Sequence, residues 1–81
     1  VHPRAEVGSG SVVRAGAVIE AGAKLGEGCF VGPGCWLGSG VELGDRSYLT
    51  AHVQIYPGVR IGTDFRAHAG VVVGSDGFGY A

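Results

Sequence analysis

An aliphatic side chain recurs at every sixth position along almost the whole of this chain. No charged residue interrupts the series, and Ala67 is its only undersized member. An amphipathic helix repeats its apolar positions about every 3.6 residues and a half-buried strand every second residue, so neither explains a period of six. A fixed period of this kind indicates a repeat architecture. The series is Val7, Val13, Ile19, Leu25, Val31, Leu37, Leu43, Leu49, Ile55, Ile61, Ala67 and Val73.

The glycines follow the same six-residue repeat as the aliphatic residues. Of the 17 glycines, seven come directly after an aliphatic position and eight come three residues after one, and only Gly77 and Gly79 fall outside these phases. Glycine is the usual residue where the backbone turns tightly or takes a positive φ. Each six-residue unit is therefore predicted to be a short extended segment followed by a corner. The aliphatic residue, and the mostly small residue two positions before it, are expected to point inward.

Three such units close a triangular coil, and successive coils stack by parallel pairing about 4.8 Å apart. The prediction is an all-β fold, the hexapeptide-repeat parallel β-helix, with about four and a half coils. Proteins with this repeat wind left-handed, against the usual hand of parallel crossovers, and we expect that hand here. No coil buries its aliphatic side without a neighbour, so the chain is expected to be marginally stable as an isolated monomer.

Length and charge restrict the class of protein further. The 81 residues suit one domain, and the net charge of −1 is dispersed, so we expect no nucleic-acid partner. The apolar stretches are too short for a membrane span, and no secretory signal is present. The chain begins at Val1 already inside the repeat. We expect an internal fragment of a longer protein, with residues 1–74 forming the β-helix and residues 75–81 beginning a projecting loop.

Three histidines are candidates for chemistry. His2 and His68 directly follow an aliphatic position and His52 follows one by three residues, which predicts corner positions. A positioned histidine is the usual general base in acyl transfer, so His52 or His68 is a candidate base, and a solvated or interface corner is the alternative. Metal ligands stacked on one face would be separated by multiples of about 18 residues. The actual spacings do not fit, so no metal site is predicted.

Several other residues fit structural roles. Cys29 and Cys35 occupy equivalent positions six residues apart, which predicts small inward-facing side chains and fits a reducing cytoplasm. Trp36 and Tyr56 stand next to aliphatic positions and should point outward, as at a subunit interface. The acidic residues in outward or corner phases are expected to form a solvated rim: Glu6, Glu20, Glu27, Glu42, Asp45 and Asp64.

The last segment breaks the frame. After Val73 and Gly74 the chain reads Ser75-Asp76-Gly77-Phe78-Gly79-Tyr80-Ala81, and Gly79 stands where an aliphatic residue is due. A loop that leaves a rigid scaffold is a common place for a binding site. We therefore predict a substrate-binding contribution here, with a simple exit turn as the alternative. The candidate residues are Asp76, Gly77, Phe78, Gly79 and Tyr80.

The run Val71 to Ala81 resembles the segment before the projecting loop of the UDP-3-O-acylglucosamine N-acyltransferases of lipid A synthesis. His2-Pro3, Val53 to Tyr56 and Val59 to Gly62 are similar to further stretches of that family. The hexads alone are shared by many acyltransferases, whereas the ending is specific. The resemblance implies a cytoplasmic homotrimer that moves a 3-hydroxyacyl chain from acyl carrier protein to the 2-amino group of a UDP-sugar, with no metal or bound organic cofactor.

The resemblance also implies that the catalytic histidine lies beyond residue 81, in a hexad of the form Ile-Ala-His-Asn. The run Arg66-Ala67-His68-Ala69 precedes the Gly-Phe-Gly-Tyr segment, so the role is not transferred to His68. No catalytic residue is therefore predicted within the chain, which is expected to be inactive alone. Three alternatives stay open: the related UDP-N-acetylglucosamine O-acyltransferase, another hexapeptide-repeat acyltransferase, and a non-catalytic structural or interaction module.

Overall fold

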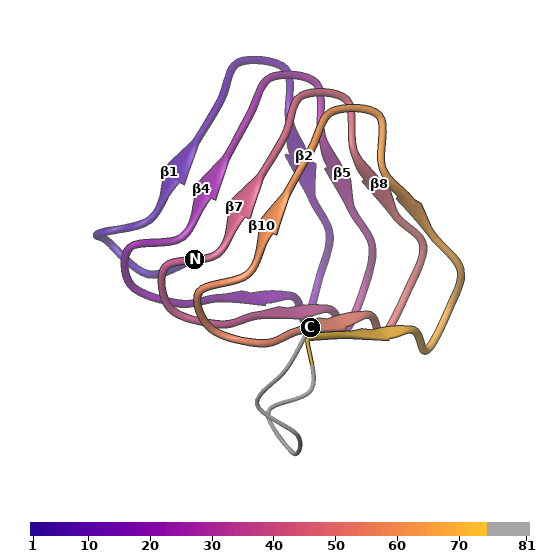
Figure 1. The fold of residues 1–81 in the computed structure, drawn as a ribbon. Coiled ribbons are helices and arrows are strands. Elements are labelled where there is room, and N and C mark those ends of the chain that lie inside the picture. Colours follow the sequence, from indigo (N-terminus) through magenta and orange to yellow (C-terminus); the bar gives the residue numbers. More distant parts are fainter. Residues whose placement is uncertain (75–81) are drawn as a thin grey trace.

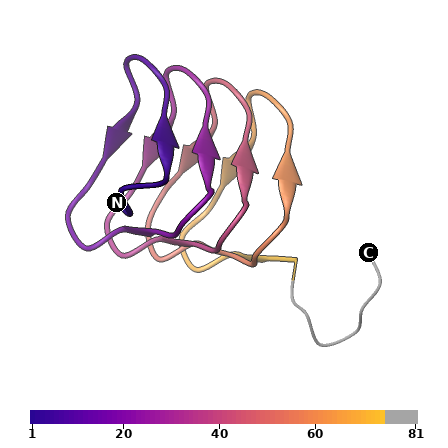
Figure 2. The ribbon, with the colours of Figure 1, turned by 90° about the vertical axis from the view of Figure 1, so that its left-hand side faces the viewer.

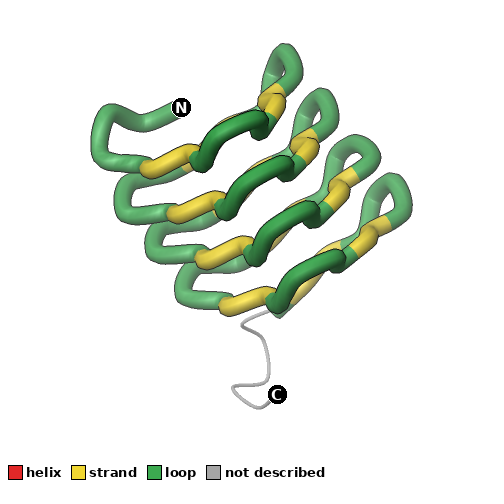
Figure 3. The backbone as a smooth tube through the Cα atoms, turned by 90° about the horizontal axis from the view of Figure 1, so that it is seen from above, coloured by secondary structure: helices red, strands yellow, loops and turns green. Residues whose placement is uncertain are grey.

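The computed structural model describes residues 1–74, and these form a triangular solenoid of two-residue strands without any helix (Figures 1 and 3). Every strand pairs in parallel with the strand 18 residues away, for example Val31 with Leu49. The strands are β1 (Glu6–Val7), β2 (Val12–Val13), β3 (Val18–Ile19), β4 (Lys24–Leu25), β5 (Phe30–Val31), β6 (Trp36–Leu37), β7 (Glu42–Leu43), β8 (Tyr48–Leu49), β9 (Gln54–Ile55), β10 (Arg60–Ile61), β11 (Arg66–Ala67) and β12 (Val72–Val73).

The strands make three flat sheets of four strands each, one on each side of the prism. We call them sheet A (β1-β4-β7-β10), sheet B (β2-β5-β8-β11) and sheet C (β3-β6-β9-β12). The corner residues between them form three edges. The A–B edge comprises residues 8–11, 26–29, 44–47 and 62–65. The B–C edge comprises 14–17, 32–35, 50–53 and 68–71, and the C–A edge comprises 2–5, 20–23, 38–41 and 56–59.

The winding is left-handed. In Figure 1 each turn runs up sheet A, down sheet B and back along sheet C, which is clockwise. Figure 2 shows the same turns from the side of sheet A, with the later turns on the right. That right-hand side is the side that faces the viewer in Figure 1, so the chain advances toward the viewer there. A chain that advances toward the viewer while turning clockwise is left-handed. The predicted fold class, a left-handed parallel β-helix, is confirmed, and residues 1–74 make about four of the four and a half coils predicted for the chain.

The core consists of the two inward-pointing phases that the sequence predicts. Leu37, Leu49 and Ile55, from the aliphatic series, have no exposed surface, and neither do Val41 and Val53 from two positions earlier. Cys29 and Cys35 belong to the second phase and are buried free thiols, as predicted. The core therefore runs as one column along the axis, closed on all sides by the three sheets.

Glycine is needed at the two repeated positions for different structural reasons. All eight glycines three residues after an aliphatic position have φ between 66° and 79°, so they make the turns. Most of the glycines directly after an aliphatic position instead lie close to the next coil. A Cβ on Gly32, for instance, would meet the Thr50 carbonyl. The prediction that all these glycines turn the chain is thus correct for one phase, whereas close packing between coils explains most of the other.

Candidate functional site

Residues Asp76, Gly77, Phe78, Gly79 and Tyr80, the predicted substrate-binding set, lie outside the described residues. The last described residue before that segment is Gly74. Gly74 follows β12 at the C–A edge of the last turn, with a φ of 74°. A Cβ placed on it would meet the Val59 side chain and would lie 3.8 Å from the Cβ of Tyr56. Gly74 therefore lies directly against Tyr56, one turn earlier.

An aromatic and acidic cluster extends from the same edge across the outer side of sheet C. The indole Nε1 of Trp36, in β6, donates a hydrogen bond to Oε2 of Glu20 at 3.0 Å. The ring of Trp36 meets Tyr56 edge-to-face, with centroids 5.8 Å apart and planes 81° apart. All three residues are half-buried, and they come from three successive turns. Trp36 and Tyr56, which were predicted to point outward, therefore form with Glu20 a continuous surface that ends at Gly74.

The two candidate bases lie at a different edge. His52 and His68 both occupy the B–C edge, in the third and fourth turns, and both are exposed. His52 occupies the corner position where other turns have glycine. Its φ is 51°, and its imidazole covers Gly34. His2 lies at the C–A edge, where its Nδ1 accepts the Arg4 N–H at 3.0 Å. His52 and His68 thus lie at a different edge from Glu20, Tyr56 and Gly74.

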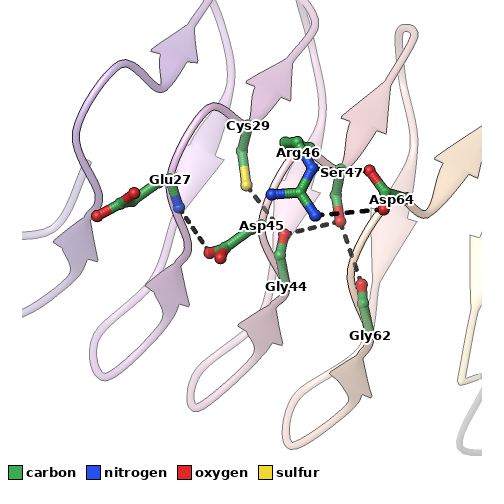
Figure 4. Close-up of polar contacts among 8 residues, drawn as sticks. All are labelled: Glu27, Cys29, Gly44, Asp45, Arg46, Ser47, Gly62 and Asp64. Atoms are coloured by element: carbon green, nitrogen blue, oxygen red, sulfur yellow. Dashed lines mark hydrogen bonds and ion pairs between the residues drawn. The ribbon is translucent and has the colours of Figure 1, made fainter.

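Polar contacts at the A–B edge connect successive turns (Figure 4). The guanidinium of Arg46 donates from Nε to Oδ1 of Asp64 at 3.0 Å and from Nη2 to Oδ2 at 3.3 Å. This hydrogen bond is the main cause that lowers the pKa of Asp64, and it likewise raises the pKa of Arg46. Both side chains are largely exposed. One turn earlier, Asp45 Oδ1 accepts the backbone N–H of Glu27 at 2.9 Å.

Beneath these exposed contacts the same edge carries buried ones. The Ser47 hydroxyl donates to the carbonyl of Gly44 at 2.8 Å, and the thiol of Cys29 donates to the same oxygen at 3.2 Å. Ser11 Oγ accepts the N–H of Cys29 at 2.9 Å. Small polar side chains in the inward phase thereby satisfy corner carbonyls and amides. The A–B edge therefore consists of structural contacts between turns rather than a reaction centre.

Sequence reasoning missed two features. Arg46, His52 and Asp64 occupy glycine slots and adopt φ values of 59°, 51° and 60°. The outer side of sheet B carries an aromatic ladder. The rings of Phe30 and Tyr48 stack with centroids 4.6 Å apart, and Arg66 lies over Tyr48 at 5.7 Å. The sequence contained the signal for the ladder, because residues 18 apart, such as Phe30, Tyr48 and Arg66, occupy the same position in successive turns.

Within residues 1–74 there is no pocket and no group of three or more His, Cys, Asp or Glu side chains placed to hold a metal ion. The same described residues include no helix long and apolar enough to cross a membrane.

The chain resembles known acyltransferases. Residues 22–57 match the family model described as the hexapeptide repeat of succinyl-transferase. Among solved structures, the chain is similar to a mutant of perosamine N-acetyltransferase from Caulobacter crescentus, determined in complex with CoA and GDP-perosamine. The identity is 32%, the TM-score is 0.75, and the match covers 93% of this chain but only 44% of that protein. Among curated proteins, no sequence matches. The chain is therefore a hexapeptide-repeat β-helix that is similar to those of acyltransferases, with a sugar N-acetyltransferase as a structural neighbour.

Proposed function

We propose that the chain is the β-helical part of an N-acyltransferase that moves a 3-hydroxyacyl group from acyl carrier protein to the 2-amino group of UDP-3-O-acylglucosamine. The observation that carries this proposal is the similarity over 93% of the chain to an enzyme that acylates an amino sugar. The Ser-Asp-Gly-Phe-Gly-Tyr run after Gly74 supports this particular reaction, because it resembles the segment before the projecting loop of the UDP-3-O-acylglucosamine N-acyltransferases.

The proposed reaction is the transfer of an acyl group from sulfur to nitrogen. The sugar amine attacks the thioester carbonyl, an amide bond forms, and the thiol leaves, while a general base takes the proton of the amine. We assign that base to a histidine outside these 81 residues, since His52 and His68 lie away from the edge where the candidate substrate-binding segment begins. Sheet C and the C–A edge then serve as a wall of the site, and no metal or organic cofactor takes part.

The arrangement of Trp36, Tyr56 and Glu20 supports a role in substrate binding. The two half-buried rings offer an apolar surface, and the carboxylate held by the indole N–H offers an acceptor beside it. An acylated amino sugar presents both an apolar chain and polar donors. Within this proposal, the cluster contacts the sugar or the start of its acyl chain, beside Gly74.

The proposal also includes a cytoplasmic homotrimer, with the sites lying between subunits. A second candidate is the transfer of an acetyl group from CoA to a nucleotide-linked amino sugar. The structural neighbour favours it, because that enzyme was determined with CoA and GDP-perosamine.

The test is product analysis by mass spectrometry after incubation of the UDP-sugar amine with 3-hydroxyacyl carrier protein. The complete protein that contains this chain should form the amide, and the 81-residue chain alone should form none. The double substitution of His52 and His68 by Ala in the complete protein should keep most of the activity. Amide formation by the isolated chain, or loss of activity in the double variant while it remains folded, would contradict the assignment.

A further inference from the structure

Arg66, on the outer side of sheet B, has no carboxylate partner within residues 1–74. The two ion pairs of this part of the chain join Arg46 to Asp64 and Arg60 to Glu42. Asp64 precedes Arg66 by two positions, but its carboxylate accepts both hydrogen bonds of Arg46. The described acidic residues all lie on sheet A or on the two edges beside it, so sheet B and the B–C edge carry none. An anion that approaches Arg66 from this side therefore meets no described carboxylate that would repel it.

The aromatic ladder of sheet B holds the guanidinium of Arg66 in place. Arg66 pairs in register with Tyr48 of the previous turn, and its guanidinium carbon lies over the Tyr48 ring, 5.7 Å from the ring centre. That ring stacks in turn on Phe30, with centroids 4.6 Å apart and planes 15° apart. A guanidinium over a ring contacts it with one face, whereas its N–H donors lie in the guanidinium plane. The ladder therefore positions Arg66 and leaves its donors available to a ligand.

His68 lies on the same side of the chain as Arg66. Only Ala67 separates the two residues, and Ala67 is buried in the core, whereas Arg66 and His68 are both exposed. Extended backbone alternates its side chains, so residues two apart point to the same side, with Cα atoms about 7 Å apart. The N–H and the hydroxyl of Thr50 both donate to the Ala67 carbonyl, at 3.1 Å and 2.7 Å. These two hydrogen bonds fix the backbone between the two exposed side chains.

We propose that Arg66 and His68 form a binding site for a phosphate or diphosphate group. The guanidinium fork binds two phosphate oxygens at once. The imidazole adds a further N–H donor, and a positive charge when it is protonated. With charge-assisted hydrogen bonds of about 2.8 Å from each side chain, a phosphate group fits between two residues about 7 Å apart. Residues 1–74 contain no pocket, so the site suits the exposed phosphate of a ligand that stays largely outside the prism.

This site is separate from the surface proposed for acyl transfer. It joins the outer side of β11 to the B–C edge, whereas Glu20, Tyr56 and Gly74 lie at the C–A edge. The inference therefore does not rest on the proposed function, and binding is measured without turnover. Two sources supply the same phosphate chemistry, a small soluble ligand and a lipid headgroup, and the experiment separates them.

The test measures the binding of two probes to the complete protein that contains this chain. The soluble probe is inorganic pyrophosphate, followed by isothermal titration calorimetry at fixed ionic strength. The lipid probe is a phosphatidylcholine vesicle with or without phosphatidic acid, followed by co-sedimentation. Arg66→Ala removes the fork, Arg66→Lys keeps the charge without the fork, and His68→Gln removes the imidazole. Arg60→Ala is the matched control, because Arg60 is an exposed arginine of the same turn on sheet A. Circular dichroism reports whether each variant folds.

We expect pyrophosphate to bind the wild type and Arg66→Ala to weaken binding about tenfold or more, as the loss of charge-assisted hydrogen bonds implies. Arg66→Lys and His68→Gln should weaken binding by less. Arg60→Ala removes the same charge on another side of the prism and should change binding by less than about twofold, because salt screens distant exposed charges. Should Arg66→Ala fail to fold, Arg66→Lys replaces it in the comparison, and wild-type affinity in that variant would overturn the inference.

The two probes identify the source of the phosphate. Binding of pyrophosphate without vesicle binding assigns the site to a soluble ligand, whereas Arg66-dependent binding to phosphatidic acid vesicles assigns it to a lipid headgroup. The inference would be overturned by a wild type that binds neither probe, by equal affinities of the wild type and folded Arg66→Ala, or by an equal loss in Arg60→Ala. Acyl transfer is read separately from product mass, so its failure leaves this result unaffected.

Discussion

Substitution of Gly32 by alanine tests directly how closely the turns of the β-helix pack. Gly32 follows β5 and is buried. Its N–H donates to the Leu49 carbonyl at 2.8 Å, across to the next turn. An added Cβ would meet the carbonyl oxygen of Thr50 and would lie 2.5 Å from its carbon. Ordinary carbon contacts are about 3.5–4.0 Å, so the two turns must separate by about 1 Å at this point.

The cost follows from that separation. Overpacking of this kind costs about 1–3 kcal/mol, and a weakened or lost ladder hydrogen bond adds about 0.5–1.5 kcal/mol. We expect Gly32→Ala to lower the free energy of unfolding by about 2–4 kcal/mol. A domain of this length has a total stability of about 4–12 kcal/mol. With about 4–8 °C per kcal/mol for small domains, the midpoint of thermal unfolding should fall by roughly 10 °C or more.

Gly62 provides the matched control, because it holds the same place in its hexad as Gly32. A Cβ there meets no atom of residues 1–74 within 4 Å, and its φ is not in the left-handed region. Gly62→Ala should therefore change stability by less than about 1 kcal/mol, in the stabilising direction if at all, since alanine restricts the unfolded chain. Thermal unfolding followed by circular dichroism compares both variants. Equal midpoints for Gly32→Ala and the wild type would refute the packing argument.

Three further predictions concern the A–B edge and the core. Ser47→Ala removes a buried hydroxyl that donates to a corner carbonyl, so urea unfolding should show a loss of about 1 kcal/mol; an unchanged midpoint would show that the carbonyls need no such donor. Because its contact with Arg46 lowers the pKa of Asp64 in the folded state, this pair stabilises the fold above the unfolded pKa of about 3.9 and stops doing so as pH falls through the lower folded value. Asp64→Asn should therefore destabilise at pH 7 more than at pH 3 in urea titrations, and an equal effect at both would contradict the ion pair. The thiols of Cys29 and Cys35 are 1% exposed, so they should react with a thiol reagent only at the rate of unfolding; rapid reaction in the native state would contradict their burial.

The repeat made the fold predictable because one slot has one environment in every turn. A residue such as Leu37 or Val53 could be placed in the core from its phase alone. The conformation of His52 could not be predicted in the same way, because glycine occupies the equivalent position in other turns. Its position in the hexad does not indicate that the residue adopts a φ of 51° or that its imidazole covers Gly34. That conformation is rare for residues other than glycine.

The candidate site was less predictable than the core. Trp36 and Tyr56 were expected to face outward, but their edge-to-face contact and the bond to Glu20 join three turns of a left-handed coil. Such contacts depend on the direction in which large side chains lean along the sheet. The position of a residue within its hexad does not determine that direction. The prediction for residues 76–80 rests on the frame break and the family resemblance, and it stays a prediction.

The most direct test of the acyltransferase account is a competition between donors. The complete protein that contains this chain is supplied with the UDP-sugar amine and with equal concentrations of 3-hydroxyacyl carrier protein and acetyl-CoA, and the product masses are measured. We predict that the amide with the 3-hydroxyacyl chain forms and dominates. Acetylated sugar as the main product would replace the proposed donor by CoA, and the absence of any amide would contradict the account.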